Sequence, residues 1–463
     1  MKRIAFTTYS LCFALLGLLA ANFTSSAQSA KKYNVLFVAV DDLNDWIGPF
    51  GGYKGIKTPN LDKLAQRGIV FKKAYCSAPA CNPSRASLLT GIRPSTSGVY
   101  HNNQPWRPVL PDAVTLPQYF TANGYAVFGA GKIYHDTFND SASWPAYFPV
   151  PRSPIPAKAP VHGFEHFDWS PVSATDEEMG DYSIVNQGID FLKKDHDKPF
   201  FLAIGLTRPH LPWYVPQKYF DMYPLSDIVI PKIPANDLSD VPQAGVAMAK
   251  PKGDHKFIVE HKQWELAVQG YLASITFADA QIGRLLDALQ RSPFSENTII
   301  VLFGDHGWHL GEKEHWRKFA LWEEAARVPF IVVAPGINAG NVTSERTVNL
   351  MDIYPTLVEL CGLPTKKALE GMSLVPLLRN PQLAWPHPSV TTHGFGNHAV
   401  RSERWRYIRY KDGTEELYDH DKDPQEWKNL ANDTKYVAIK KELAKWLPTV
   451  NAPDAPTKKE TEE

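Results

Sequence analysis

Residues 35–42 read Val-Leu-Phe-Val-Ala-Val-Asp-Asp, an apolar run that ends in two acids. Four further short apolar runs have the same character, and they span residues 125–130, 200–206, 298–303 and 330–334. Runs of this kind, without polar alternation, are typical of strands buried on both faces of a parallel sheet. The sequence therefore predicts five buried parallel strands.

Helical patterns alternate with these runs. The clearest lies between the third and fourth runs and has apolar residues at helical spacing: Ile275, Ala278, Ile282, Leu285, Leu286 and Leu289. Strands that alternate with helices predict a doubly wound α/β core. Residues 144–160 and 228–254 are long irregular connections, and such connections are often functional.

The chain of 463 residues is long enough for a main domain, predicted over 28–370, and a smaller one over 371–450. In the smaller domain, 400–410 and 415–418 flank a Lys-Asp-Gly turn and predict an antiparallel hairpin. Residues 436–447 predict a closing helix, and we expect 451–463 to be a disordered tail.

The composition narrows the function classes. Lys plus Arg equals Asp plus Glu, at 49 each, so no basic surplus indicates nucleic-acid binding. Residues 1–27 have the pattern of a signal peptide, with Lys2 and Arg3 before an apolar stretch and small residues up to Ala27. A membrane anchor is the alternative, which Thr7, Thr8 and Ser10 within the stretch disfavour. We expect a secreted or periplasmic protein without a membrane span after signal removal.

Export makes the cysteines informative. Cys76, Cys81 and Cys361 remain after cleavage, and an odd number in an oxidising compartment indicates at least one thiol with another fate. Cys81 opens Cys81-Asn82-Pro83-Ser84-Arg85, and a Cys76–Cys81 bridge would close a very small loop. We therefore interpret Cys81 as a residue kept for its chemistry.

Polar side chains gather where the predicted strands end. They are Asp41 and Asp42, Lys132 with His135, Arg208 with His210, and Asp305 with His306. Ligands of open α/β sheets bind beyond the carboxyl ends of the strands. Singly, each residue could be a helix cap or a packed loop residue, but together they predict a site.

Paired acids favour a divalent cation at this edge. Carboxylate oxygens suit Ca²⁺, with Mg²⁺ as the alternative. Zinc competes because His306 could bind it. A cation also offsets the repulsion between acids packed together.

These residues, in this order, resemble the type I sulfatases of the alkaline phosphatase superfamily, from residue 34 to about residue 430. Cys81–Arg85 with Leu89-Thr90-Gly91 is similar to the family signature. Segments 131–135, 208–212, 304–308 and 310–312 with Lys318 resemble most the iduronate-2-sulfatase group and its bacterial relatives. The resemblance implies a mixed, mostly parallel sheet flanked by helices, with an antiparallel sheet in the C-terminal subdomain. It also makes 28–370 a catalytic domain.

The resemblance further implies that a maturation enzyme oxidises Cys81 to formylglycine. One hydroxyl of the hydrated aldehyde would attack sulfur, and the other would then expel sulfate. Asp41, Asp42, Asp305, His306 and the modified Cys81 would hold Ca²⁺.

Further roles follow from the same resemblance. Arg85 would steady the diol, Lys132 and Lys318 would neutralise sulfate oxygens, His210 would protonate the leaving oxygen and His135 would assist at the diol. Without the motif, each lysine would be interpreted as a solvated surface residue. Arg208, Trp308 and His309 are the candidates for substrate contact. The iduronate-type group has Lys where this chain has Arg208, so sugar specificity does not transfer.

Sulfate removal from carbohydrates, such as glycosaminoglycan or algal ulvan or carrageenan fragments, is the leading hypothesis. Two alternatives stay open. One is a phosphoester or phosphonate hydrolase that uses the same group and metal, and the other is a glycan-binding protein in which Cys81 is never converted. Trp213, Tyr214 and Trp308 could be sugar platforms or plain packing residues.

Overall fold

The computed structural model describes residues 32–135, 138–337 and 340–458. The predicted signal peptide lies outside the described residues. Tyr33–Glu463 forms one compact unit, so the division at residue 370 stays a prediction. Among the helices in the described ranges, none has the length and apolarity that a bilayer crossing needs.

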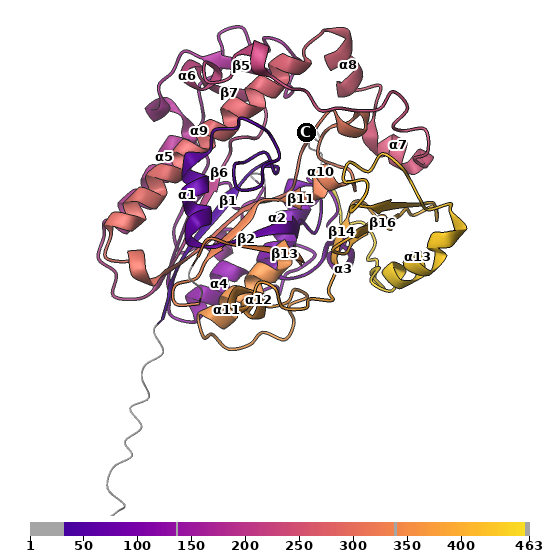
Figure 1. Cartoon of the computed structure of the whole chain (residues 1–463). Coiled ribbons are helices and arrows are strands. Elements are labelled where there is room, and N and C mark those ends of the chain that lie inside the picture. Colours follow the sequence, from indigo (N-terminus) through magenta and orange to yellow (C-terminus); the bar gives the residue numbers. More distant parts are fainter. Residues whose placement is uncertain (1–31, 136–137, 338–339, 459–463) are drawn as a thin grey trace, which may run out of the picture. The chain divides into compact units, whose positions relative to one another are not determined.

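A nine-stranded sheet forms the centre of this unit (Figure 1). Eight strands lie in the order β11 (Arg327–Val328), β2 (Ile69–Tyr75), β12 (Phe330–Val333), β8 (Thr298–Gly304), β1 (Asn34–Val40), β6 (Phe200–Leu206), β3 (Ala126–Gly131) and β4 (Tyr147–Phe148), and β13 (Val342–Asn349) pairs with β2. Strands β8, β1, β6, β3 and β4 are mutually parallel.

The four central predicted strands are confirmed to within a residue at each end. The prediction for 330–334 was wrong in direction, because β12 runs antiparallel to both β8 and β2. The sheet is therefore mixed and mostly parallel, as the resemblance implied.

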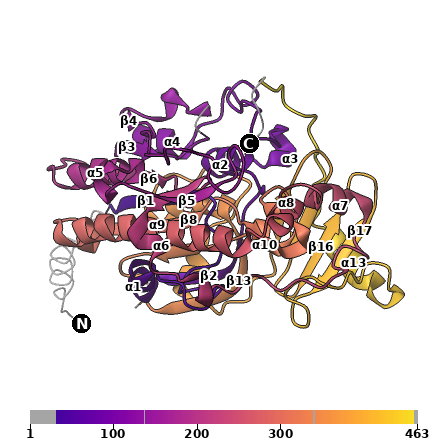
Figure 2. The same ribbon diagram turned by 90° about the horizontal axis from the view of Figure 1, so that it is seen from above.

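Helices cover both faces of the sheet (Figures 1 and 2). Their bounds are α1 Pro59–Arg67, α2 Cys81–Thr90, α3 Pro94–Ser97, α4 Leu116–Ala122, α5 Gly180–Leu192, α6 Gln217–Phe220, α7 Gln243–Ala249, α8 Asp254–Glu260, α9 Trp264–Arg291, α10 Glu323–Ala326, α11 Ile353–Leu360, α12 Val375–Arg379 and α13 Val437–Ala444. The helix predicted at 275–289 lies within α9.

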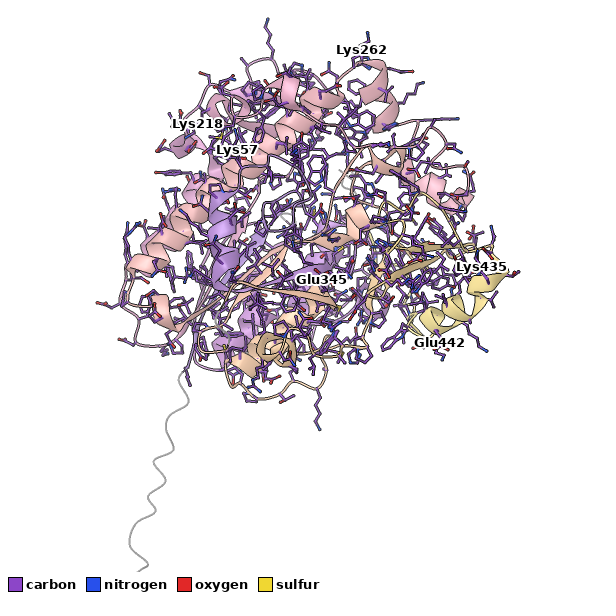
Figure 3. The ribbon with its side chains drawn as sticks, viewed as in Figure 1. Lys57, Lys218, Lys262, Glu345, Lys435 and Glu442 are labelled. Carbon is purple, nitrogen blue, oxygen red and sulfur yellow. The ribbon has the colours of Figure 1, made fainter. Side chains whose placement is uncertain are left out.

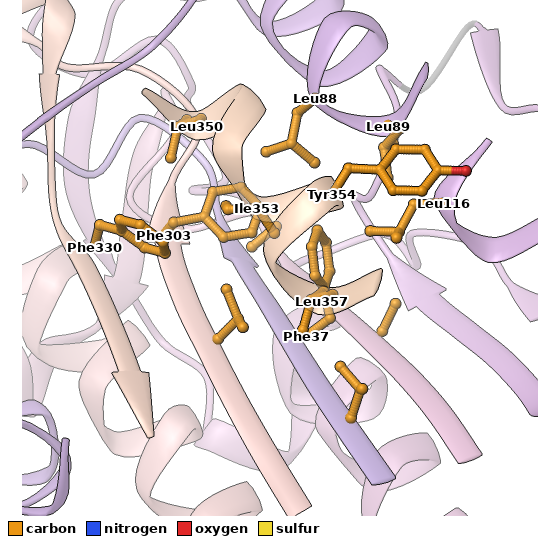
Figure 4. Close-up of a cluster of buried hydrophobic side chains, with 14 of the residues drawn as sticks. Phe37, Leu88, Leu89, Leu116, Phe303, Phe330, Leu350, Ile353, Tyr354 and Leu357 are labelled. Carbon is orange, nitrogen blue, oxygen red and sulfur yellow. The ribbon is translucent and has the colours of Figure 1, made fainter. Parts of the chain in front are cut away.

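Strand β1 shows how the two faces are filled. Phe37 points to a cluster that includes Leu88 and Leu89 of α2 and Leu357 of α11 (Figure 4). Its neighbours Leu36 and Val38 pack into the other cluster, which contains α5 and α9 residues. Alternate side chains of a strand face opposite sides, so an unbroken apolar run is what a sheet covered on both faces requires.

Short paired strands surround this sheet. Strand β5 (Trp169–Val172) pairs parallel with β7 (Trp213–Pro216), and β9 (His309–Leu310) pairs antiparallel with β10 (Trp316–Arg317). A separate antiparallel sheet contains β14 (Ser389–Thr392), β15 (His398–Arg401), β16 (Trp405–Arg409) and β17 (Glu415–Asp419).

The C-terminal predictions need two corrections. Residues 400–410 are not one strand: they contain the end of β15, a turn and β16, because the chain reverses at 402–404. Residues 451–458 are not a disordered tail. Ala452 and Ala455 donate backbone hydrogen bonds of 2.8 Å to Ser95 and Gly98. The rest of the predicted tail, 459–463, lies outside the described residues.

Gly131 ends β3 just before Lys132, and its φ is +80°. A Cβ there would lie 2.0 Å from the Gly205 carbonyl oxygen on β6. We expect Gly131→Ala to lower the free energy of unfolding by roughly 2–5 kcal/mol, from left-handed strain plus the clash. Gly124→Ala is the matched control, because φ is +84° but no atom lies within 4 Å, and it should cost about 1–2 kcal/mol. Urea unfolding followed by tryptophan fluorescence measures both, and equal losses would contradict this packing.

Candidate active site

Cys81 is the first residue of α2 and is completely buried. Its Sγ lies 3.3 Å from His306 Nε2, 3.1 Å from Lys318 Nζ and 3.6 Å from Asp41 Oδ1. Burial, reinforced by the Asp41 carboxylate, raises the pKa of the thiol well above its usual value. Because Cys81 begins α2, the positive end of the helix dipole also faces this position.

Asn82 and Ser84 of the signature make contacts that fix this helix, and Pro83 suits its first turn. The Asn82 side chain donates to the carbonyl oxygens of His101 and Gln104 at 2.9 and 2.7 Å. Pro83 lies in the first turn, where a missing N–H costs no helical bond. Ser84 Oγ donates to the Asp305 carbonyl oxygen at 2.5 Å. The pentapeptide therefore anchors α2 to the end of β8 and to the loop after α3.

Arg85 joins two acids that follow neighbouring strands. Its Nη2 lies 3.1 Å from Asp41 Oδ1 and its Nε 2.8 Å from Asp305 Oδ2, and all three side chains are buried. It also donates to the carbonyl oxygens of Lys132 and Ile133. Burial raises the pKa of Asp305, and the Arg85 charge opposes that shift. Arg85 is thus a fixed bridge between β1, β8 and the end of β3.

Two lysines from distant segments complete the charge balance. Lys132 Nζ lies 2.6 Å from Asp41 Oδ2, and Lys318 Nζ lies 3.0 Å from Asp42 Oδ1. Burial alone would raise the pKa of Asp41, but the surrounding cations, of which Lys132 acts most strongly, hold it well below its usual value. Both lysines are buried, which rules out the interpretation as solvated surface residues.

The His306 ring is oriented by its backbone. Its Nδ1 lies 3.0 Å from the Gly307 carbonyl oxygen, which can only accept, so Nδ1 carries the proton. Burial lowers the pKa of the ring. The neutral Nε2 lone pair therefore faces Asp42 Oδ1 at 3.3 Å and Asp305 Oδ2 at 3.6 Å, as a metal ligand requires.

The donor set fits one divalent cation. Ligand atoms of Asp41, Cys81, Asp305 and His306 all lie within 4.8 Å of one another, and Asp42 joins Asp41, Cys81 and His210 in a second such group. Donors about 2.3–2.6 Å from a Ca²⁺ ion lie at most about 5 Å apart. Asp42 Oδ2 is buried without a hydrogen bond to the described residues. Three carboxylates and one imidazole thus favour a hard cation.

His210 enters from the loop after β6. Its Nε2 lies 3.9 Å from Asp42 Oδ2, and its Nδ1 donates to the Leu211 carbonyl oxygen at 2.6 Å. The Arg208 guanidinium donates to the His210 and Tyr214 carbonyl oxygens, at 2.8 and 3.4 Å. Arg208 therefore braces the loop that holds His210, and its predicted contact with substrate stays a prediction.

The remaining candidates differ in placement. Trp308 lines a cavity with His210 and Lys318 but is itself only 1% exposed, so its contact with substrate stays a prediction. His309 is fully buried, its ring lies 4.9 Å from His315, and its Nδ1 faces the Glu312 carbonyl oxygen. Its predicted contact with substrate stays a prediction.

Two more predicted neighbours can be placed. His135 follows β3 and its ring lies 6.0 Å from Phe138; its role at the diol stays a prediction. Trp213 is fully buried and Tyr214 nearly so, so both pack rather than offer a sugar platform.

Sequence reasoning missed residues that support Asp42 and the loop that holds His210. Tyr271 on α9 donates to the Asp42 carbonyl oxygen at 2.7 Å and accepts from the Asn44 N–H at 3.0 Å. Asp181 on α5 accepts the N–H groups of Thr207 and Arg208 at 2.8 Å. No local pattern marks these residues, since their partners lie far along the chain.

Comparison with known proteins agrees with this geometry. A family model described as "Sulfatase" matches residues 33–363, and one described as "N-sulphoglucosamine sulphohydrolase, C-terminal" matches 311–452. A sulfatase of Formosa agariphila is 39% identical over 92% of this chain and 88% of its own. Human iduronate 2-sulfatase is 32% identical over 80% of this chain and 71% of its own.

A solved structure shares the fold. The phosphonate monoester hydrolase of Agrobacterium radiobacter superposes with a TM-score of 0.75, at 23% identity, over 89% of this chain and 94% of that one. At this identity the match supports the alkaline phosphatase-like architecture and does not decide between sulfate and phosphonate substrates.

We expect Ca²⁺ to raise the melting temperature of chelator-treated protein, because an ion that binds only the folded state stabilises it by about 2.7 kcal/mol at 100 times its Kd. Asp42→Asn should reduce this gain strongly, since it removes one anionic ligand; Asn also tolerates the φ of +57° at this position. Asp287→Asn, an exposed change on α9, is the control and should keep the gain. A full Ca²⁺ response in Asp42→Asn would contradict this ligand set.

Proposed function

Because this chain belongs to the sulfatase family and is therefore a sulfuric ester hydrolase, we propose that it removes sulfate from carbohydrates. The substrates are oligosaccharides from sulfated polysaccharides, of the algal ulvan or carrageenan type or of the glycosaminoglycan type. One observation carries the proposal. Cys81 lies among three acids, His306 and two buried lysines, and its Sγ is within 3.6 Å of Asp41, His306 and Lys318. The iduronate 2-sulfatase relative supports a sugar substrate.

Cys81 is the precursor of the reactive group. We propose that a formylglycine-generating enzyme converts it, and that the hydrated aldehyde supplies one hydroxyl to attack sulfur and a second to drive release of sulfate. A serine would lack the second hydroxyl. The position fits the modification, since Sγ already faces Asp41, His306 and Lys318.

Asp41, Asp42, Asp305 and His306 would hold the cation, with Ca²⁺ favoured over Mg²⁺. A bound divalent ion supplies positive charge next to the reacting oxygen atoms. The protein keeps these acids in place in advance, through Arg85 on Asp41 and Asp305.

The sulfate group would bind next to positive charges that the fold holds in place. Lys132 pairs with Asp41 and Lys318 pairs with Asp42, and the amino-terminal end of α2 adds its dipole. Charges held in place before the reaction stabilise the negative charge of the transition state without reorganisation. This electrostatic contribution is what the buried lysines provide.

His210 is the donor for the leaving sugar oxygen. Its Nδ1 is held by the Leu211 carbonyl oxygen, so Nε2 is the atom that faces Asp42 and the cavity. Arg208 donates to the His210 carbonyl oxygen and so fixes this loop. A side chain held in this way delivers its proton to one position.

We also propose that residues 1–27 direct export, after which the protein acts in the periplasm or outside the cell. Sulfated polysaccharides are too large to cross a membrane unaided, so an exported enzyme meets its substrate there. The division into a catalytic domain over 28–370 and a C-terminal subdomain over 371–450 belongs to the same proposal.

Cys81→Ala should abolish sulfate release while leaving the melting temperature nearly unchanged, because the change removes one buried sulfur atom. Cys361→Ala is the matched control, since Cys361 is also a buried thiol and should keep activity. Mass analysis of the Cys81 peptide from the native host should show an aldehyde. An unmodified thiol in fully active protein would refute the mechanism, and a large preference for phosphate or phosphonate esters would refute the sulfatase assignment.

His210→Gln should slow hydrolysis of a sugar sulfate by roughly 10²–10⁴-fold, the usual contribution of a general acid. A nitrophenyl sulfate needs little protonation of its leaving group and should lose far less. The ratio of the two rates is thus the measurement. Equal losses on both esters would show that His210 does not protonate the leaving oxygen.

A further inference from the structure

A cavity of about 540 Å³ lies beside the active site and takes no part in the mechanism above. Its walls come from distant segments: the loop after α3, helix α7 with Lys250, Phe319, and the turn between β14 and β15. Ligand cavities in proteins usually have roughly 300–1,000 Å³. The cavity is therefore large enough for a small ligand.

Two short connections join this cavity to the active site. Phe319 follows Lys318 directly and also lines the cavity that contains His210 and Trp308. On the other wall, Asn102 Oδ1 accepts the N–H of Asn82 at 3.0 Å, and Asn82 is the neighbour of Cys81. A ligand that enters the active site thus reaches the second cavity across Phe319.

The cavity contains polar atoms without partners. Asn102 is 6% exposed. Its Oδ1 is engaged, while its Nδ2 has no hydrogen bond to the described residues. His393 Nδ1 is likewise buried and unbonded. Leaving a buried polar atom without a partner costs about 1–3 kcal/mol, so a hydrogen-bonding group that reached these atoms would be stabilised.

The fixed charge of this cavity comes from Lys250. The side chain is exposed, and among the described residues no ion pair joins it to a carboxylate. Burial, together with neighbouring His101, lowers the pKa of His393 to about 3, so this ring is neutral at pH 7. Lys250 also lines a third cavity, with Arg317, whose charge is already paired with Asp254. Lys250 is therefore the cation available to a ligand.

Helix α7 is held firmly in this place. A Cβ on Gly245 would lie 2.7 Å from Tyr410 Oη and 2.8 Å from Glu416 Oε1, so the helix backbone lies directly on the C-terminal sheet. Figures 1 and 2 show α7 beside β16. Lys250 follows this helix with a φ of +50°. The fold therefore fixes the position of α7, which forms part of the cavity wall.

We propose that this cavity is a second saccharide subsite, which binds an anionic sugar next to the one that loses sulfate. The inference rests on the proposed function. Lys250 binds the carboxylate or sulfate of that sugar, Asn102 Nδ2 donates to one of its oxygen atoms, and the Phe319 ring packs against the sugar at the junction of the two cavities. The enzyme thereby selects polysaccharide fragments that carry charge on adjacent units.

The test compares four substrates on the mature holoenzyme: an aryl sulfate and three sulfated disaccharides whose second sugar carries a carboxylate, a sulfate or no charge. Lys250→Asn removes the charge, and Asn tolerates the left-handed backbone. We expect KM to rise about tenfold for the disaccharides with a charged second sugar. For the neutral disaccharide and the aryl sulfate we expect less than a twofold change. The disaccharide with the larger rise identifies the bound anion.

Lys262→Asn is the matched control. Lys262 is exposed, has a φ of +54° and lies at the edge of the molecule, outside these cavities (Figure 3). It should leave all four KM values unchanged. Equal effects of Lys250→Asn on charged and neutral disaccharides, or no effect on any, would overturn the subsite. If the wild-type enzyme cleaves none of the four sulfate esters, the proposed function is refuted instead.

Discussion

The buried Arg85 bridge between Asp41 and Asp305 is the interaction on which the site depends. Strands β1 and β8 pair in parallel with Val40 opposite Gly304, so the acids that follow them must lie together. Such acids repel one another unless cations lie between them. Arg85 binds one acid from each strand, and Lys132 and Lys318 add their charges to Asp41 and Asp42. Loss of one member of a buried ion pair usually costs about 3–5 kcal/mol, because an uncompensated charge remains.

This bridge also places Cys81. Arg85 lies one helical turn after Cys81 on α2, so the position of the guanidinium fixes the start of the helix. Ser84 holds the same turn to the Asp305 carbonyl oxygen, and Asn82 holds it to the opposite loop. The position of Cys81 therefore follows from the contacts of Asn82, Ser84 and Arg85, which together leave the helix little freedom to shift or rotate. The signature residues are structural supports as much as chemical groups.

The sequence predicted the central strands well because an apolar run reports burial on both faces. It could not report direction, which is why β12 was expected to be parallel. It also missed β2, whose Lys72 and Lys73 interrupt the run, and the polar strand β13. The strand-end rule brought Asp41, Lys132, His210 and Asp305 together correctly. Lys318 came only from the resemblance, since it lies in a loop whose position depends on the left-handed Arg317 and Phe319. Residues such as Tyr271 depend on contacts between distant segments, which no local pattern contains.

With Lys250 in the proposed subsite, chemistry and substrate selection occupy different parts of this chain. The charged groups around Cys81 lie at the edge of the central sheet, while Lys250 and His393 lie on segments that pack with the C-terminal sheet. Lys318 and Phe319 connect these two parts of the chain. The Lys318 ammonium lies 3.0 Å from Asp42, whereas the ring of the next residue lines all three cavities. A change in α7 or in the β14–β15 turn can therefore alter which sugar is bound without moving the acids, because those acids are held by Arg85 and not by the cavity wall.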